Sequence, residues 1–140
     1  MTDTSHDPAP RVLIIEDDFL LALEMEITLL DAGFDVIGHA VNQRTALNEI
    51  AERMPDVALV DFNLADGATG PDIAFTLSRR GVACLFVTSQ NPSFTEQSPA
   101  IGLLSKPIDP DGLIEAVRCV LSLHHGQTPA RTPHGLRLLR

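Results

Sequence analysis

Residues 57–72 read VALVDFNLADGATGPD, and this stretch changes character abruptly in the middle. Four consecutive apolar residues, Val57 to Val60, lead directly into the carboxylate of Asp61 and then into a polar loop that contains two glycines. A short, continuous apolar run is typical of a strand that is covered on both faces, as in a parallel sheet. The sequence therefore predicts a buried strand whose carboxyl end presents Asp61.

Strand-like and helix-like segments alternate on both sides of this stretch. Further strands are expected at 12–15, 35–40, 82–87 and 103–104, and helices at 19–32, 43–53, 71–80 and 110–123. The last helix has Asp109 as its N-cap and Pro110 at its first position, which are preferred residues there. Alternation at this spacing predicts right-handed βαβ crossovers and a five-stranded parallel sheet between layers of helices.

The composition is that of a single globular domain. The chain has 140 residues, 44% of them apolar, and no run approaches the roughly 18 to 20 apolar residues of a membrane span. The N-terminus lacks the pattern of a secretory signal, and Cys84 and Cys119 form no metal or disulfide pattern. These features predict a soluble, cytoplasmic protein without a membrane partner. The net charge of −9 argues against nucleic acid as a partner.

The two ends of the chain differ from the middle. Residues 1–10 have no apolar period and are expected to form a disordered N-terminal tail. Residues 126–140 contain prolines and arginines and are expected to form a basic C-terminal tail, either disordered or in contact with a partner. The folded domain is expected at 11–125.

Chemically reactive side chains gather at the ends of the predicted strands. In an open α/β sheet, ligands bind at the carboxyl ends of the strands. The residues expected at that edge are Glu16, Asp17 and Asp18, then Asp61, then Thr88 and Ser89, and finally Lys106. Neighbouring carboxylates repel one another unless a cation is present, and oxygen ligands without histidine or cysteine favour Mg²⁺ over zinc.

Such a site is suited to phosphoryl transfer. A metal ion, an ammonium group and a hydroxyl can neutralise the oxygens of a transferring phosphoryl group. Asp61 is then the expected nucleophile, and it would form an acyl phosphate.

The order of these motifs resembles a response-regulator receiver domain of two-component signalling, of the stand-alone type found in alphaproteobacteria. The resemblance covers about residues 11–123 and rests on VLIIEDD (12–18), VDFNLADG (60–67), FVTS (86–89) and LSKP (104–107). It implies an α/β fold, the (βα)5 flavodoxin-like doubly wound sandwich, with a five-stranded parallel sheet in the order 2-1-3-4-5.

The resemblance also implies a role for each site residue. Mg²⁺ would be held by Glu16, Asp17, Asp61 and the backbone carbonyl of Asn63. Asp61 would accept the phosphoryl group, Thr88 would be the switch hydroxyl, and Lys106, followed by what is usually a cis Pro107, would pair with the phosphate. The donor would be a histidine kinase or a histidine phosphotransferase, and a downstream protein would read the switch. The protein would not be an enzyme beyond its own phosphorylation and dephosphorylation.

Two departures from the receiver pattern concern the fourth helix and the switch aromatic. Thr88 and Lys106 are 18 positions apart, a few fewer than is usual, and prolines interrupt the segment between them. A fourth helix there is expected to be shortened to about one turn or irregular, and this leaves dimerisation open. Leu103 occupies the position of the usual aromatic, and Phe94 is an alternative to it.

Simpler interpretations compete for several of these residues. The acids at 16–18 are also suited to a helix N-terminus, and Asp61 to capping of the following loop. Lys106 alone resembles an ordinary surface lysine, and Ser89 is an alternative to Thr88 as the hydroxyl.

The helix at 19–32 carries two apolar stripes. Leu21, Met25, Thr28, Leu29 and Ala32 form one stripe, and Leu20, Leu23, Ile27 and Leu30 form the other on roughly the opposite side. One helix cannot bury both stripes against one sheet. The second stripe therefore either packs on the last helix or forms an exposed docking patch for the phosphodonor.

Two other functions compete with the switch. A Mg²⁺-dependent phosphatase with an aspartate nucleophile needs an acid two residues later, where Asn63 cannot protonate a leaving group. A phosphorylation-independent binding module would account for the altered helix and the missing aromatic, but not for retention of the transfer residues.

Overall fold

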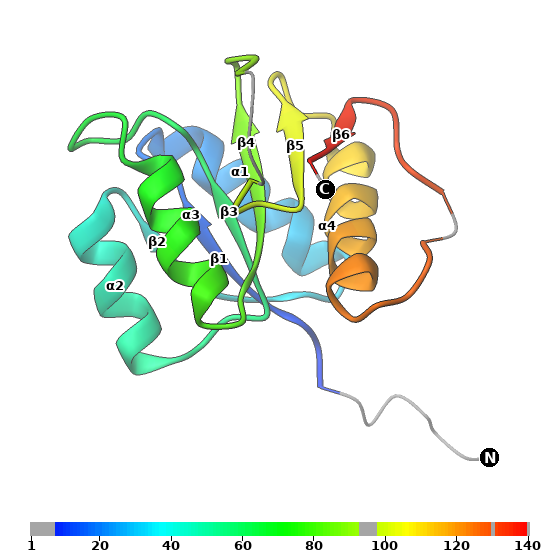
Figure 1. Ribbon diagram of the computed structural model, residues 1–140, viewed down its shortest axis with the longest axis horizontal. Coiled ribbons are helices and arrows are strands. Elements are labelled where there is room, and N and C mark those ends of the chain that lie inside the picture. The colour runs from blue at the N-terminus through cyan, green and yellow to red at the C-terminus, as the bar shows by residue number, and fades with distance from the viewer. Residues whose placement is uncertain (1–7, 93–97, 130, 140) are drawn as a thin grey trace.

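The computed structural model describes residues 8–92, 98–129 and 131–139. Figure 1 shows strands that alternate with helices along most of the chain. The elements in chain order are β1 (Arg11–Ile15), α1 (Phe19–Asp31), β2 (Asp35–Ala40), α2 (Gln43–Glu52), β3 (Val57–Val60), α3 (Gly70–Arg79), β4 (Ala83–Thr88), β5 (Gly102–Ser105), α4 (Pro110–His124) and β6 (Leu136–Leu138).

All the strands lie in one sheet with the order β2-β1-β3-β4-β5-β6. The first five are parallel, which confirms the predicted α/β fold and the order 2-1-3-4-5. The structure adds a sixth strand that the sequence analysis did not predict. β6 comes from the C-terminal tail and runs antiparallel to β5, with Leu136 opposite Leu104.

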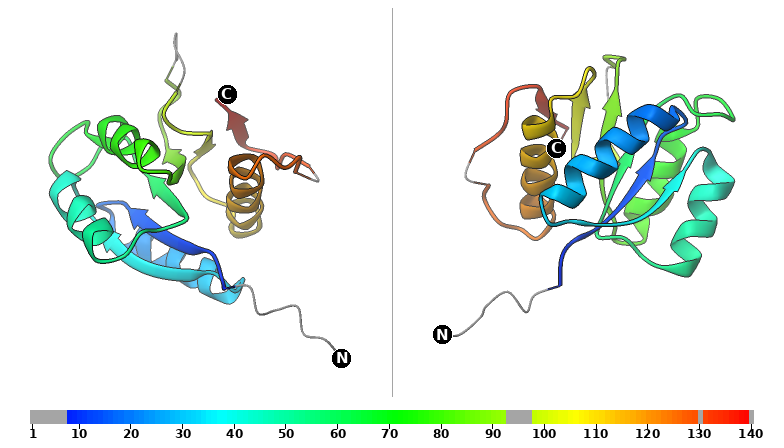
Figure 2. Two further views of the ribbon diagram at one scale, coloured as in Figure 1. Left: turned by 60° about the horizontal axis from the view of Figure 1, so that its bottom comes forward. Right: turned by 180° about the vertical axis from the view of Figure 1, so that it is seen from behind.

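Helices cover both faces of the sheet and divide the core into two clusters. Figure 2 shows α2 and α3 on one face and α1 and α4 on the other. Side chains that alternate along each strand enter the two clusters in turn. Ile14 and Leu59, for example, pack under α1 and α4, whereas Ile15 and Val60 pack under α2 and α3. This burial on both faces explains why the strands have continuous apolar sequences.

Local capping signals fix where the helices begin. The Asp18 carboxylate accepts a hydrogen bond from Leu21 N at 3.2 Å, and the Asp109 carboxylate accepts one from Gly112 N at 2.9 Å. Asn42 and Thr45 form a reciprocal capping box at α2. Asp109 was predicted as an N-cap, and this prediction is confirmed.

Several predictions concern residues outside the described ranges. Residues 93–97 are among them, and they include Phe94 and part of the segment between Thr88 and Lys106 where a shortened helix was predicted. Residues 1–7 of the predicted N-terminal tail also lie outside these ranges. The described parts of the connection between β4 and β5, 89–92 and 98–101, contain bends and no helix. Within the described residues, no helix combines the length and the apolar character needed to cross a membrane.

The second apolar stripe of α1 lies on the surface. Its four members have exposed fractions of 65% (Leu20), 39% (Leu23), 52% (Ile27) and 49% (Leu30). Packing of this stripe on α4 was one of the two predicted alternatives, and it is wrong. The face that packs inward uses Ala22, Met25 and Leu29 instead.

Candidate functional site

Three charged side chains meet at the carboxyl edge of the sheet because strand side chains alternate between its two faces. Glu16, Asp61 and Lys106 each lie two positions beyond a side chain that packs under α1 and α4. Those preceding residues are Ile14, Leu59 and Leu104. Since β1, β3 and β5 are parallel members of one sheet, the residues that follow them are brought to the same edge and the same side.

Lys106 joins the two carboxylates. Its Nζ lies 2.9 Å from Oε1 of Glu16 and 2.9 Å from Oδ2 of Asp61. The carboxylates are nearly buried, with side-chain exposures of 2% for Glu16 and 10% for Asp61, whereas Lys106 is 20% exposed. The interpretation of Lys106 as an ordinary surface lysine is therefore wrong. The peptide bond between Lys106 and Pro107 is cis, as the resemblance implied.

The protonation equilibria reflect this burial. Burial raises the pKa of the Glu16 carboxyl above its ordinary value of 4.5, and hydrogen bonding and charge from Lys106 only partly oppose the rise. Burial lowers the pKa of Lys106, but its bonds to Asp61 and Glu16 outweigh that effect and leave the pKa above 10.5. Lys106 is therefore a positive charge at neutral pH.

Glu16 has one oxygen that is buried and depends on a cation. Oε1 of Glu16 is buried, and its ion pair with Lys106 at 2.9 Å is the one close cation contact that the described residues give it. A buried carboxylate oxygen without a donor is costly unless a cation compensates it. This oxygen fits a metal ligand.

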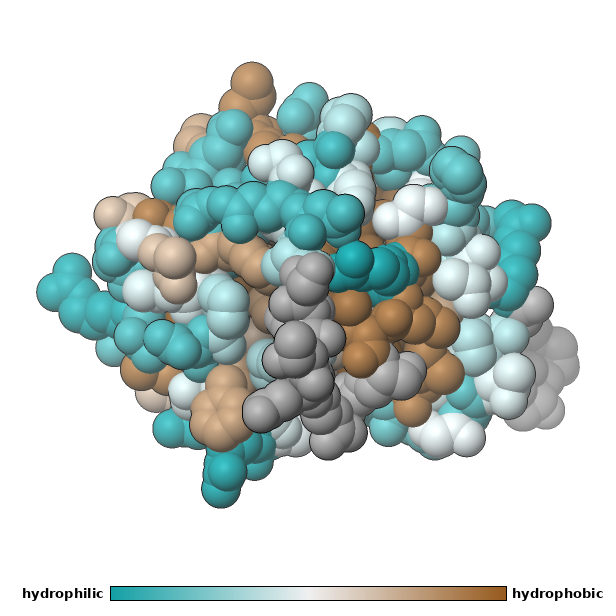
Figure 3. Space-filling view, turned by 45° about the horizontal axis from the view of Figure 1, so that its top comes forward, coloured by the Kyte–Doolittle hydropathy of each residue, from teal (hydrophilic) through white to brown (hydrophobic). Residues whose placement is uncertain are grey.

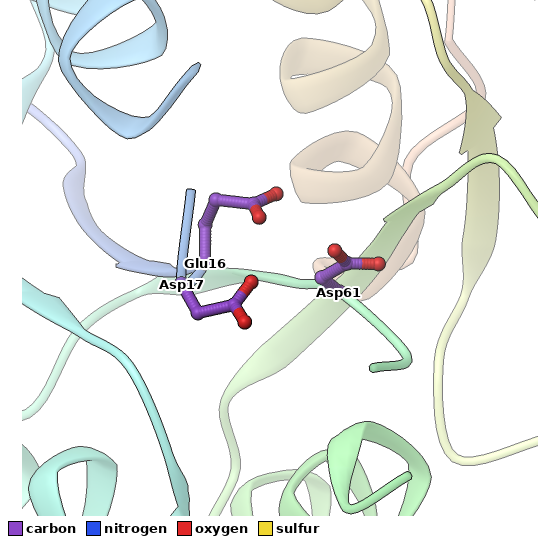
Figure 4. A group of neighbouring side chains, drawn as sticks. All are labelled: Glu16, Asp17 and Asp61. Atoms are coloured by element: carbon purple, nitrogen blue, oxygen red, sulfur yellow. The ribbon is translucent and has the colours of Figure 1, made fainter. Parts of the chain in front are cut away.

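A third carboxylate completes an acidic cluster. Oxygens of Glu16, Asp17 and Asp61 all lie within 4.8 Å of one another. Figure 4 shows Glu16 and Asp17 side by side after β1, with Asp61 on the adjacent segment after β3. Asp17 is exposed, which leaves one side of the cluster open to solvent. Among the described residues, Lys106 pairs with two of these three carboxylates, Glu16 and Asp61. Oxygen ligands of this kind suit a hard divalent cation such as Mg²⁺.

The remaining predicted site residues lie near this cluster in the fold. Thr88 is the last residue of β4, is 1% exposed, and accepts a hydrogen bond through Oγ1 from Gln90 N at 3.1 Å. Ser89, the alternative hydroxyl, is exposed. Asn63 is exposed in the turn after β3, and its carbonyl as a metal ligand stays a prediction. Figure 3 brings this edge of the sheet forward and shows hydrophilic and apolar residues intermixed around it.

Neighbouring acids take on much of the local capping that was the simpler interpretation of the site's carboxylates. Asp18 is the acid that caps α1, which frees Glu16 and Asp17 from that role. Asp61 does accept a hydrogen bond from Phe62 N, at the start of the loop after β3, at 2.7 Å. Asp66 holds the rest of that loop, because its carboxylate accepts hydrogen bonds from Thr69 Oγ1 at 2.6 Å and Gln43 N at 3.1 Å. Both contacts lower the pKa of Asp66, Thr69 more strongly than Gln43.

Two residues that support the site were missed from the sequence. Nε2 of His39, in β2, lies 2.6 Å from the backbone carbonyl oxygen of Glu16. This contact helps to hold the backbone that carries Glu16 and Asp17. Gly70 begins α3 directly against the backbone of Asp61, where a Cβ atom would meet the Asp61 carbonyl oxygen at 1.9 Å. The sequence signal for Gly70 was present in the loop after Asp61, but its backbone contact is visible only in three dimensions.

Comparison with known proteins agrees with this arrangement. Residues 12–118 match the response regulator receiver domain family. This chain is a member of that family. The matched region contains the whole acidic cluster, Thr88 and Lys106.

Individual relatives show how far the similarity extends. The receiver is 33% identical to the phyllosphere-induced regulator PhyR of Methylorubrum extorquens over 108 residues, which are 74% of this chain and 40% of that protein. The chain spans only about half the length of other curated relatives that it matches, the DNA-binding response regulators MtrA. What those longer proteins bind or regulate is therefore not carried over to this chain.

Solved structures support the same fold. The signal receiver domain of a modulated diguanylate cyclase from Desulfovibrio desulfuricans G20 is 30% identical, with a TM-score of 0.74, covering 84% of this chain and 97% of that one. A CheY-like receiver domain from Methanospirillum hungatei has a TM-score of 0.75 at 23% identity, covering 84% and 98%, and this likeness concerns the fold alone.

Proposed function

We propose that this receiver is a phosphorylatable switch. It accepts a phosphoryl group from a phosphohistidine of a histidine kinase or a histidine phosphotransferase onto Asp61, with Mg²⁺, in the cytoplasm. The phosphorylated form then acts on a protein partner or passes the phosphoryl group on. The protein has no enzymatic activity other than its own phosphorylation and dephosphorylation.

One observation carries this proposal. The ammonium of Lys106 lies 2.9 Å from both Glu16 and Asp61, at the edge where Asp17 completes a cluster of three carboxylates. A lysine that only neutralised a buried acid would need one partner. Here it lies between the expected nucleophile and an expected metal ligand, so that its positive charge is available to a phosphoryl group that arrives at Asp61.

The transfer step uses groups that the chain supplies. A carboxylate oxygen of Asp61 attacks phosphorus, and the bond between phosphorus and the imidazole nitrogen of the donor breaks. The electron pair of that bond returns to the imidazole, which takes up a proton from solvent, and Asp61 becomes an acyl phosphate. Lys106 neutralises the phosphoryl oxygens, and Thr88 is the nearby hydroxyl available to donate to them. A divalent cation held by Glu16, Asp17, Asp61 and the carbonyl of Asn63 adds further positive charge there when bound.

The exposed stripe of α1 is proposed as the docking surface for the donor. Its four leucine and isoleucine side chains begin one residue beyond the exposed Phe19, next to the acidic cluster at the end of β1. Monomeric proteins rarely expose such contiguous apolar residues without a partner. A donor helix that covers this stripe is adjacent to the edge of the sheet on which Asp61 lies.

The proposal is tested by incubating the protein with acetyl phosphate and measuring its intact mass at neutral pH. Wild type in Mg²⁺ is expected to gain the mass of one phosphoryl group, and wild type in EDTA and the Asp61→Asn variant are expected to gain none. A protein that gains no mass under any condition, although it remains folded, would instead act as a phosphorylation-independent binding module. Equal labelling of Asp61→Asn would refute Asp61 as the acceptor.

A further inference from the structure

The C-terminal clip, which we define as residues 136–139, closes the outer edge of the sheet. β6 pairs with β5, and Leu139 N donates a hydrogen bond to Ile101 O at 2.8 Å. Leu136 packs into the cluster under α1 and α4, whereas Leu139 packs against the cluster under α2 and α3. The clip therefore holds both faces of the sheet edge and covers backbone groups of β5 that would otherwise be unpaired.

Arg137 ties the clip to the loop that follows β4. Its guanidinium donates hydrogen bonds to Oδ1 of Asn91 at 2.9 Å and to the carbonyl oxygen of Pro92 at 2.7 Å. Arg137 is exposed, so it contributes little to the core. Its two bonds join the C-terminus of the chain to a loop about 45 residues earlier.

The same loop is tied at its start to the buried hydroxyl of Thr88. Gln90 N donates to Thr88 Oγ1 at 3.1 Å, and Gln90 immediately precedes the residues that Arg137 holds. Thr88 ends β4, which is the neighbour of β3, and Asp61 directly follows β3. A continuous series of bonded residues thus connects the edge that carries Asp61 to the clip.

We propose that phosphorylation of Asp61 loosens the C-terminal clip, an inference that rests on the proposed function. A phosphoryl group on Asp61 brings strong acceptor oxygens to the edge of the sheet. When the Thr88 side chain turns to donate its hydroxyl to those oxygens, Gln90 N loses its acceptor. The loop at Asn91 and Pro92 then changes conformation, the bonds to Arg137 are lost, and the edge of β5 is uncovered.

This arrangement supplies a readout where the usual one is absent. Leu103 stands at the position of the common switch aromatic and is only 2% exposed. In the pairing of β5 with β6 it lies opposite Arg137. Leu103 is therefore held in the core and does not report phosphorylation by turning. Its cross-strand neighbour Arg137 instead contacts the loop that is proposed to move on phosphorylation.

Thermodynamic linkage makes the proposal testable in both directions. If occupancy at Asp61 weakens the clip, then weakening the clip must strengthen occupancy by the same factor. Removal of the Arg137 side chain is therefore expected to tighten the binding of a phosphoryl analogue about five-fold or more, the lower range of typical coupling. Arg131→Ala is a matched control, because Arg131 lies in the C-terminal segment shortly before the clip but pairs with Glu115 on α4.

The experiment is hydrogen exchange with mass spectrometry on the full chain in Mg²⁺, at increasing concentrations of beryllofluoride. Peptides around Asp61 report binding of the analogue, and peptides around β5 and β6 report the clip. In wild type, binding is expected to slow exchange in peptides around Asp61 and to speed it in peptides around β5 and β6. Arg137→Ala is expected to show fast exchange at β6 without the analogue and to reach half-saturation at a lower concentration than wild type or Arg131→Ala.

The outcomes separate this inference from the proposed function. Protection around Asp61 with unchanged or slower exchange at β6 would overturn the clip mechanism and leave the proposed function standing. Equal half-saturation for Arg137→Ala and Arg131→Ala would also overturn the clip mechanism. No response around Asp61 in any variant would overturn both.

Discussion

Gly70 offers a sharp test of how the fold positions Asp61. The substitution Gly70→Ala would place a Cβ atom 1.9 Å from the Asp61 carbonyl oxygen and 2.7 Å from the Cα of Phe62, both backbone atoms. Ordinary contact begins at 3.4 Å, so the start of α3 and the chain at Asp61 must separate by about 1.5 Å. Overpacking of this kind costs about 1 to 3 kcal/mol, and the better helix propensity of alanine offsets part of it.

We therefore expect Gly70→Ala to lower the free energy of unfolding by about 2 kcal/mol, or Tm by roughly 4 to 8 °C for a chain of this size. We also expect phosphorylation by acetyl phosphate to slow by up to about 100-fold, because a displacement of about 1 Å is enough to lose alignment. Thermal unfolding and the rate of mass gain measure the two effects, the second at a temperature where the variant is fully folded.

Gly112→Ala is the matched control, since it makes the same change in the first turn of another helix. Its Cβ would lie 3.4 Å from the nearest atom, an oxygen of Asp109, which is ordinary contact. This variant is expected to unfold at or above the wild-type Tm and to be labelled at the wild-type rate. If Gly70→Ala behaved like Gly112→Ala in both assays, the close contact between α3 and Asp61 would not be what positions the nucleophile.

Three further predictions concern the acidic cluster, β6 and α1. Because burial raises the folded-state pKa of Glu16, its contribution to stability is present below pH 4.5 and is lost as the pH rises through the raised pKa. In EDTA, the Tm of Glu16→Gln relative to that of wild type should therefore increase with pH over that range, and a constant difference would contradict this. Leu136→Ala should lower the free energy of unfolding, measured by chemical denaturation, by about 2 to 3 kcal/mol, and Leu138→Ala by less than about 1 kcal/mol, since these side chains are 9% and 38% exposed. Equal losses would mean that β6 is not part of the core. Ile27→Glu should slow phosphoryl transfer from the cognate donor at least ten-fold without lowering Tm, unlike Phe75→Glu, an equally exposed change on α3; a large fall in Tm would show that the α1 stripe packs internally.

The sequence contained most of the information that determines the fold. Continuous apolar strands can only be buried on both faces, so their alternation with helices specified a parallel sheet and hence the edge where acids and Lys106 meet. The N-cap at Asp109 was equally explicit, because a carboxylate before a proline has a direct local function. These are short-range signals, and each can be interpreted without knowing the rest of the chain.

The features that were missed depend on contacts between distant segments. β6 has only three residues, and its pairing with β5 depends on where the preceding tail runs rather than on any period of its own. His39 and Gly70 act on the backbone of Glu16 and Asp61, and nothing in their local sequence identifies those partners. The two stripes of α1 were found, but which one stays exposed depends on how α1 packs against the sheet and α4 together.

The most direct test of the central claim is to locate the phosphoryl group. Protein treated with acetyl phosphate and Mg²⁺ is reduced with borohydride, which converts an aspartyl phosphate to homoserine, and is then digested and sequenced by mass spectrometry. We predict homoserine at position 61 in wild type, and none when EDTA replaces Mg²⁺. Homoserine at another aspartate, or a phosphoryl group that survives reduction on a serine, threonine or histidine, would contradict the assignment of Asp61 as the acceptor.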